Sequence, residues 1–551
     1  MEQITITLDG VRLQVKKGVC LEELLGGRGK ESLCPVMTAV VGGRIRELNY
    51  QPEEGDEIRL LDISDPDGSR AYVRGLLHIF IQAVRDLFPG TKVDIQHSMN
   101  EGIYCELQEG EQLTPFSMEK IERRMHQISE ADEPFVRHLI TRDEAIKLYK
   151  KEGQLDKARL LRFREDKKFK VYSCGSVSDY FYGHMPPSTG YIWRFRLVYS
   201  MPGCVLVYPR RTAPRKELCF TPSPKLSHVF RQSERWADIL HCGTVADLDE
   251  MVERGDLADF IRVNEALHEQ EIASIAGEIV REDRRVVLVA GPSSSGKTTF
   301  TQRLSVQLRA MEKRPIMISL DNYYLDRDKI PPQSDGTLDL ENINTLNLPL
   351  LNEHLVQLLS GREALIPRFD FKAGKSVPGR MLRLEPGDIL LMEGIHGLND
   401  TLSEAVAADD KFKIYISALT QLNLDCHNRI PTTDVRLIRR MVRDYAHRGA
   451  SVEKTFSMWP SVRAGEDRWI FPYQESCDVM FNSTLVYELL FLKKLAYPML
   501  KAIREDSPYF AEANWLVKFL KYFVEPGTQD EIEIPRTSIL REFIGGGCFE
   551  Q

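Results

Sequence analysis

The chain has 551 residues, of which 42% are apolar and 28% charged, and its formal net charge is −8. A chain of this length exceeds one ordinary hydrophobic core, so we expect about two to four domains. The acidic balance argues against a surface coated with nucleic acid, although local basic segments survive the average. The ten cysteines include no C-x-x-C pair, no apolar run approaches the length of a membrane span, and the N-terminus shows no secretion signal. Composition therefore predicts a cytoplasmic, multidomain protein with reduced thiols and no membrane contact.

The first 226 residues fall into two expected regions. Residues 1–64 alternate short β-type runs with Asp-Gly and Gly-Gly turns, which is typical of a small hairpin-rich module. Residues 65–226 begin with a helical pattern and continue through strand-like segments and a charged helical block at about 117–165. They end in a proline-containing connector. This order predicts an α+β domain behind the small module.

Residues 227–283 are expected to form a helical connector, after which strands and helices alternate. This alternation predicts a parallel sheet covered by helices, and hence an α/β domain over 284–505. A C-terminal extension, 506–551, follows it without an interpretable motif. The expected elements are a strand at 285–290, a helix at 297–311, a strand at 315–320, a helix at 350–360, and strands at 388–393 and 412–417.

The stretch "GPSSSGKTT" follows the first of these strands and opens the first helix. It satisfies the pattern G-x-x-x-x-G-K-[ST], in which glycines let backbone amides approach phosphate oxygens and the helix N-terminus adds a positive field. Lys297 would neutralise the β and γ oxygens, and the Thr298 hydroxyl would bind Mg²⁺. The pattern and its context predict a nucleotide-binding loop. Its phosphate-binding residues are Gly291, Ser293, Ser294, Ser295, Gly296, Lys297, Thr298 and Thr299.

Two acidic residues stand at the ends of later expected strands. Asp321 follows "PIMISL", and Glu393 ends the apolar run "DILLME". Strand ends of a parallel sheet face the ligand crevice, so Asp321 could accept a hydroxyl proton or help to hold Mg²⁺. Glu393 stands where a Walker-B-type acid is found. The alternatives are an ordinary turn aspartate and a surface glutamate.

The stretch "DVRLIRRMVRDYAHRG", residues 434–449, predicts an arginine-rich helix. Arg436, Arg440 and Arg443 recur at four- and three-residue spacing, which places them on one face. A row of guanidinium groups can clamp phosphates and stabilise charge that develops in a transition state. A solvated basic helix and an RNA-binding face are alternatives, but the phosphate loop in the same domain favours a lid over the phosphates.

These motifs resemble the uridine kinase and phosphoribulokinase family, and the uridine–cytidine kinases most of all. The matching pieces are "GPSSSGKTT", "SLDNYY", "IPRFDF", "MEGIHGL" and the arginine-rich helix, in the family's order over about 284–500. The resemblance implies that ATP or GTP donates a phosphoryl group to the 5′-hydroxyl of a nucleoside. It implies catalytic roles for Asp321, Lys297, Arg443 and Arg448, Mg²⁺ binding by Thr298, Glu393 and Asp321, and substrate binding by Asp339, Phe369, Arg440 and Tyr324.

The acceptor motifs depart from the family's pattern. The motif resembling "YDFxxHxR" reads "FDFKAGKS", so Phe369 replaces a base-contacting tyrosine and Gly374 replaces a histidine. The motif around Asp339 reads "LDLE" instead of "FDHP". Stacking on a base would survive these changes, but hydrogen-bond partners for a pyrimidine edge are lost, which weakens discrimination between bases.

The front half resembles the N-terminal region of threonyl-tRNA synthetases. Residues 1–64 resemble the small β-grasp-like TGS module, and 65–226 resemble the adjoining editing domain. Of the four metal-ligand positions of that family only His78 is kept; Arg74, Phe181 and Met185 occupy the others. One ligand of four cannot hold a zinc ion, so we expect a helical His78 with a structural hydrogen bond and no tRNA editing. We expect the front half to keep a binding surface for RNA or for a small regulator.

The sequence therefore predicts a homo-oligomeric P-loop kinase for a nucleoside. A kinase for another small alcohol, such as a sugar phosphate, is an alternative within the same fold. The alternative from another class is a nucleotide-regulated RNA-binding or sensor protein that uses the kinase fold as a switch. No Asn-Lys-x-Asp element, which a guanine switch would need, occurs in the chain.

Overall fold

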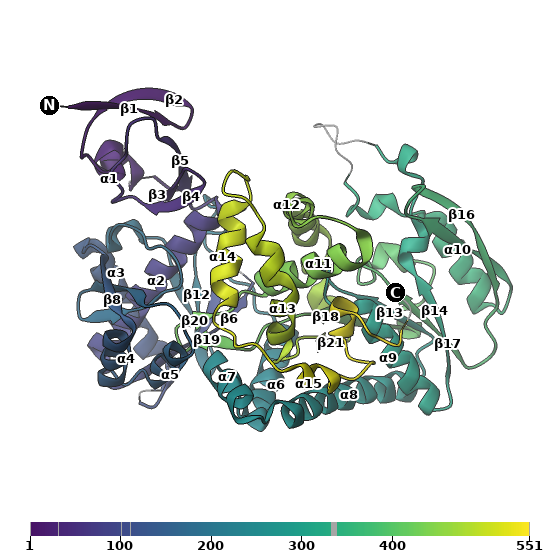
Figure 1. The fold of residues 1–551 in the computed structure, drawn as a ribbon. Coiled ribbons are helices and arrows are strands. Elements are labelled where there is room, and N and C mark those ends of the chain that lie inside the picture. The colour runs from purple at the N-terminus through teal and green to yellow at the C-terminus, as the bar shows by residue number, and fades with distance from the viewer. Residues whose placement is uncertain (1, 31, 101, 111, 332–338, 550–551) are drawn as a thin grey trace.

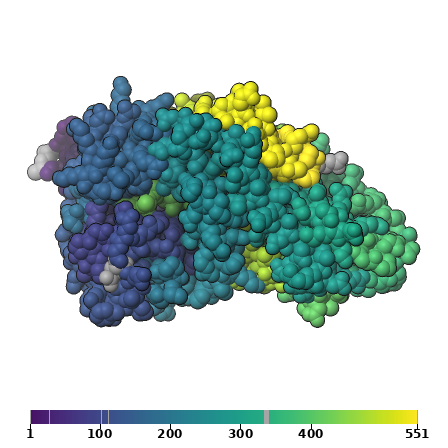
Figure 2. All heavy atoms as spheres, turned by 90° about the horizontal axis from the view of Figure 1, so that it is seen from below, coloured from purple at the N-terminus to yellow at the C-terminus, as the bar shows by residue number. Residues whose placement is uncertain are grey.

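The computed structural model describes residues 2–549 apart from 31, 101, 111 and 332–338. The N-terminal regions form one side of the molecule and the C-terminal half forms the other (Figure 1). Seen from below, purple and blue atoms gather on one side, teal and green atoms on the other, and yellow atoms of the C-terminal segment lie along their upper edge (Figure 2). Within the described residues, no helix has the length and apolar character needed to cross a membrane.

The small N-terminal module is a mixed sheet of five strands in the order β2-β1-β5-β3-β4. β1 and β5 pair in parallel, and the other pairs are antiparallel. Ile4 and Ile6 alternate toward the core while their neighbours face outward, as the period of a strand requires. The elements are β1 (Gln3–Leu8), β2 (Val11–Lys16), α1 (Leu21–Leu25), β3 (Val36–Val41), β4 (Arg44–Glu47) and β5 (Glu57–Asp62).

The second domain is built around the long buried helix α2 (Pro66–Leu87). A four-stranded antiparallel sheet, β11-β12-β7-β6, and a three-stranded sheet, β10-β9-β8, accompany it. The expected helical block at 117–165 is interrupted by a strand, since β8 pairs along its length with β9. The elements are β6 (Lys92–Met99), β7 (Gly102–Gln108), α3 (Pro115–Ala131), β8 (Val136–Thr141), α4 (Arg142–Lys151), α5 (Leu155–Arg162), β9 (Lys168–Cys174), β10 (Val177–Asp179), β11 (Arg196–Ser200) and β12 (Gly203–Val207).

The C-terminal half contains a parallel sheet of five strands in the order β14-β17-β13-β18-β21. The expected strands and helices all occur, and the predicted α/β fold is confirmed. The sequence analysis missed β21 and the hairpins β15–β16 and β19–β20. The elements are β13 (Val286–Ala290), α9 (Lys297–Ala310), β14 (Arg314–Ser319), α10 (Leu348–Leu359), β15 (Ala364–Asp370), β16 (Lys375–Leu382), β17 (Asp388–Glu393), β18 (Lys411–Ser417), β19 (Asn423–Asp425), β20 (Asn428–Arg429), α11 (Thr432–Arg448), α12 (Val452–Trp469), β21 (Val479–Asn482) and α13 (Glu488–Lys501).

The segments on either side of this half pack into the same hydrophobic core. Ile272 from the expected connector and Ile539 from the C-terminal extension belong to one buried cluster with Phe300 of α9. The extension is therefore part of the body of the C-terminal half. The flanking elements are α6 (Pro224–Leu240), α7 (Val245–Arg254), α8 (Leu257–Arg281), α14 (Phe510–Leu520), α15 (Thr528–Ile532) and α16 (Arg541–Ile544).

A buried ionic network joins the two halves where the hairpin β19–β20 meets the second domain (Figure 1). The Lys157 ammonium group of α5 donates to Asp179 of β10 and lies 2.9 Å from Nδ1 of His427, which is 2.5 Å from Asp179. The Ile95 amide of β6 also donates to the Cys426 carbonyl oxygen at 2.8 Å. The side chains of Lys157 and Asp179 are 2% and 0% exposed, so each charge depends on its partners in place of water.

We expect Lys157→Met to lower the free energy of unfolding by about 3–5 kcal/mol, because it leaves the buried Asp179 carboxylate without its cation. Urea unfolding measures the effect. Lys17→Met is the control, since that lysine pairs with Glu2 through side chains that are 57% and 70% exposed and its loss should cost less than about 1 kcal/mol. Equal losses in the two variants would show that the network does not hold the halves together.

Candidate active site

The phosphate loop lies between β13 and α9, as its sequence predicts. Gly291 has no room for a side chain, because a Cβ there would lie 2.0 Å from the Ile416 carbonyl oxygen. Gly296 has a φ of 83°, a left-handed conformation that glycine adopts without strain, and it starts α9. The first amides of α9 have no partners within the helix and point toward the position of an anion, although the Thr299 amide donates to Glu542.

Two arginines of α11 hold this loop in shape. Arg436 donates to the Ser293 carbonyl oxygen at 2.9 Å and also pairs with Glu466 of α12. Arg439 is fully buried and pairs with Glu488 of α13. The prediction that Arg436 belongs to the phosphate-facing row is therefore wrong, because its side chain is paired with Glu466. Glu466 also accepts a hydrogen bond from the Ser293 amide at 3.2 Å.

Three further arginines of α11 line the cavity beside the loop: Arg440, Arg443 and Arg448. Arg440 donates to the Ser293 hydroxyl at 2.7 Å. Asp444, which the sequence analysis did not single out, lies 3.3, 3.3 and 3.4 Å from Arg440, Arg443 and Arg448 respectively. One carboxylate thus orients three guanidinium groups and leaves an excess of positive charge at the cavity wall.

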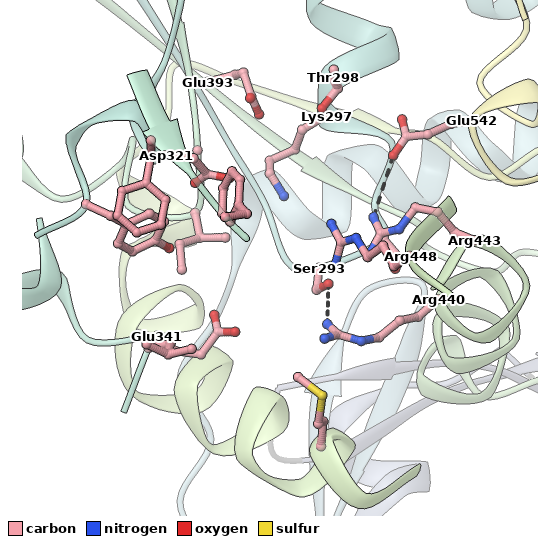
Figure 3. A pocket seen from close by; sticks show the side chains of 18 of the residues that line it. Ser293, Lys297, Thr298, Asp321, Glu341, Glu393, Arg440, Arg443, Arg448 and Glu542 are labelled. Carbon is pink, nitrogen blue, oxygen red and sulfur yellow. Dashed lines mark hydrogen bonds and ion pairs between the residues drawn. The ribbon is translucent and has the colours of Figure 1, made fainter. Parts of the chain in front are cut away.

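The cavity has a volume of about 290 Å³ and brings Lys297, Thr298, Asp321 and Glu393 together with these arginines (Figure 3). Burial raises the pKa of Asp321, and burial and the neighbouring Asp321 raise that of Glu393. Burial lowers the pKa of Lys297, which the two carboxylates oppose. Such a carboxylate pair beside a threonine hydroxyl is a set of hard oxygen donors that fits Mg²⁺.

The far end of the cavity is aromatic. The Phe369 ring lies 5.6 Å from that of Tyr324 and 5.2 Å from that of Phe371, between centroids, so two of the four predicted substrate residues, Phe369 and Tyr324, meet here. At Gly374 a Cβ would lie 2.6 Å from Cδ of Arg327, so this arginine crosses the position where the family pattern has a histidine. The wall offers flat apolar faces and one guanidinium group to an acceptor.

Asp339 lies outside this cavity, in a neighbouring depression with Asn342 and Arg468. The carboxylate of the same loop that does line the cavity is Glu341, two residues further on. Burial raises the pKa of Glu341 to about 7, while Arg440 opposes the rise. Glu341, and not Asp339, is therefore the acid of this loop that lines the cavity together with Arg440. Sequence reasoning could not choose between the two acids of "LDLE", because a loop has no fixed register.

The C-terminal extension also reaches the phosphate loop, which no sequence motif indicated. Glu542 of α16 accepts from the Thr299 hydroxyl at 2.9 Å and from its amide at 3.4 Å, and it lies 3.8 Å from Arg443 (Figure 3). A carboxylate therefore sits at the start of α9, where the loop would receive phosphate oxygens.

The front half shows what occupies the family's metal positions. Phe181 and Met185 are core residues at 1% exposure each, and Arg74 donates to the His184 carbonyl oxygen at 2.9 Å. His78 packs between Phe135 and Phe181, and burial lowers its pKa to about 4. The expected structural hydrogen bond of His78 is wrong, since within the described residues neither ring nitrogen has a partner. Apolar packing alone holds this imidazole.

Comparison with known proteins gives separate results for the two halves. Residues 286–488 match the model of the Phosphoribulokinase / Uridine kinase family, so this segment is a domain of that kinase family. A solved structure described as a possible uridine kinase from Bacillus stearothermophilus is 18% identical, covering 36% of this chain and 89% of that one, with a TM-score of 0.25. D-glycerate 3-kinase from Cryptococcus neoformans is 16% identical, covering 46% and 87%, with a TM-score of 0.21.

The N-terminal region matches threonine–tRNA ligases. The ligase of Carboxydothermus hydrogenoformans is 34% identical over 170 residues, which are 31% of this chain and 26% of the ligase. That of Desulforamulus reducens is 29% identical over 259 residues, 46% of this chain and 41% of the ligase. The chain thus spans well under half the length of these relatives.

We expect Glu542→Gln to tighten the binding of a non-hydrolysable ATP analogue about three- to tenfold, because it removes a negative charge from the start of α9. Isothermal titration calorimetry on the full chain measures the effect. Glu533→Gln is the matched control, since it lies in the same extension and pairs with Arg262 at 2.6 Å. Weaker binding in Glu542→Gln would mean that this carboxylate supports the loop instead of competing with phosphate.

Proposed function

We propose that the chain is a kinase that transfers the γ-phosphoryl group of ATP to the 5′-hydroxyl of a nucleoside. The observation that carries the proposal is one cavity with a phosphate loop and three arginines at one end and aromatic side chains at the other. Asp321 lies among them as the acid at the end of β14. A switch that only binds nucleotide has no need for an acceptor pocket of this kind.

The chemistry follows from the placement of the residues. Asp321 accepts the proton of the acceptor hydroxyl, whose oxygen forms the new bond to phosphorus as the bond to the β-phosphate oxygen breaks. Lys297, Arg443 and Arg448 stabilise the negative charge on the transferred group and on the departing ADP. Mg²⁺, held by Thr298, Glu393 and Asp321 when bound, would neutralise charge on the phosphates.

The lining of the acceptor pocket favours an acceptor with a flat ring over one that carries a phosphate group. Phe369, Phe371 and Tyr324 offer ring faces to a nucleobase, and Glu341 opposite Arg440 offers an acceptor for sugar hydroxyls. Arg327 is the one cation among the residues described at that end, whereas a sugar phosphate would favour several. Among the described residues that line this end, none offers several polar groups to a base edge, so we expect broad base selectivity.

Replacing Asp321 tests the proposed base. We expect Asp321→Asn to lower kcat about 10²- to 10⁴-fold, because the amide cannot take the proton, while the affinity for ATP measured without Mg²⁺ changes less than about threefold. The assay measures nucleoside monophosphate formed from MgATP and each ribonucleoside. Asp328→Asn, at an exposed aspartate seven residues away, is the control. Unchanged turnover in Asp321→Asn would remove this residue from the mechanism.

Glu341 should make acceptor binding depend on pH. Its carboxyl group accepts hydrogen bonds from hydroxyls more strongly when ionised, and its pKa is raised to about 7, so KM for the acceptor should fall as the pH rises from 6 to 8. Glu341→Gln should raise KM about tenfold at pH 8 and flatten this dependence. Glu353→Gln, at an exposed site on α10, should retain it. A pH profile that persists in Glu341→Gln would assign the titration to another group.

A further inference from the structure

A second, larger cavity lies between the two halves, away from the phosphate loop. Its volume is about 590 Å³, and its walls come from β4, α2, β9, the loop at 180–184 and α14. It is thus shared by the small module, the second domain and the C-terminal extension. Its volume is in the range of pockets that enclose small molecules.

The lining of this cavity, called here the junction cavity, is strongly cationic. Eight lysine and arginine side chains line it against three carboxylates. Each of these acids already contacts a cation: Glu505 lies 2.7 Å from Arg44, Asp67 lies 2.7 Å from Arg70, and Asp166 pairs with Arg164. The acids therefore leave much of the positive charge uncompensated.

Several of the lining cations make no ion pair with any residue that the structure describes: Arg46, Arg74, Lys168, Lys170 and Lys518. Burial lowers the pKa of Lys170, which Glu47 opposes, and burial together with Arg44 and Lys521 lowers that of Lys518, which Asp166 opposes. Charges in this arrangement repel one another, and an anion within the cavity would remove that repulsion.

The cavity also offers aromatic faces. Tyr182 and Trp515 pack at 4.3 Å between centroids, and the Tyr182 hydroxyl donates to the Trp515 carbonyl oxygen. The Arg74 guanidinium lies over the Trp515 ring at 5.2 Å. Both rings are half-buried, and the Arg70 guanidinium also lies 5.0 Å from the Trp515 centroid. Cations beside aromatic rings are the groups that bind phosphate and a flat base at the same time.

We propose that the junction cavity binds a free nucleotide, with its phosphates on Lys170 and Lys518 and its base against Trp515. A free ligand fits better than a nucleic acid strand, because α14 covers one side and the volume holds one small molecule. The site is distinct from the phosphate loop and does not rest on the proposed kinase activity.

One wall residue of the junction cavity, Trp515, contacts the helix that carries Arg440, Arg443 and Arg448. Trp515 Nε1–H donates to Oδ2 of Asp434, in the first turn of α11, at 2.9 Å. A ligand on Trp515 would therefore be linked, through Asp434, to the first turn of the helix that carries Arg440 and Arg443 further along. This placement is that of an effector site.

Calorimetry on the full chain tests the proposal. All measurements are made in the variant Lys297→Met, whose phosphate loop is disabled. ADP that this variant protein binds must then occupy a different site. We expect this variant to bind one ADP, and Lys170→Met/Lys518→Met added to it to weaken the binding at least about tenfold. Lys16→Met/Lys151→Met, which removes two exposed lysines elsewhere, should leave ADP affinity within about twofold.

The outcomes separate the possibilities. The melting temperature without ligand should not fall in Lys170→Met/Lys518→Met, because those charges repel their neighbours; this excludes misfolding as the cause of lost binding. Unchanged ADP affinity in that variant would overturn the proposal. So would a cavity that binds a transfer RNA, in a manner sensitive to these two lysines, but neither ADP nor any other free nucleotide.

Discussion

The site depends on the buried ion pairs that hold α11 in place, because the same helix presents three other arginines to the cavity. Arg436 and Arg439 are buried, and a buried guanidinium is tolerated only with its carboxylate in place, here Glu466 and Glu488. These pairs fix the position of α11 against the phosphate loop. Arg440, Arg443 and Arg448 are then presented to the cavity with Asp444 as their common neighbour. A shift of the helix by one residue would break both buried pairs and move the three arginines away from the cavity.

The same helix connects distant parts of the chain. Its first turn contacts Trp515 of the C-terminal extension, and its last turns face Glu542 of that extension beside the loop. The hairpin β19–β20, just before α11, carries His427 into the network with Lys157 and Asp179 of the second domain. The front half and the extension are therefore built into the kinase-type domain and are not attached by flexible linkers.

Local patterns in the sequence predicted the local parts of this structure. The loop, the strand ends at Asp321 and Glu393 and the parallel sheet follow from spacing and apolar runs, which neighbouring residues determine. Helical spacing placed Arg436 on the same face as Arg440, but it could not show that Arg436 forms an ion pair with Glu466 on another helix. Glu542 contacts Thr299 from 243 residues away, and no local pattern contains such a contact. Glu341 replaced Asp339 because loop conformation, not period, decides which acid faces the cavity.

The most direct measurement of the central claim is a phosphate balance. Purified full chain, MgATP and one ribonucleoside at a time are incubated, and ADP and nucleoside 5′-monophosphate are quantified together, with the position of the new phosphate read by ³¹P nuclear magnetic resonance. We expect equal amounts of ADP and 5′-monophosphate with at least one nucleoside. ADP released into water without any phosphorylated nucleoside, across the whole set, would contradict it.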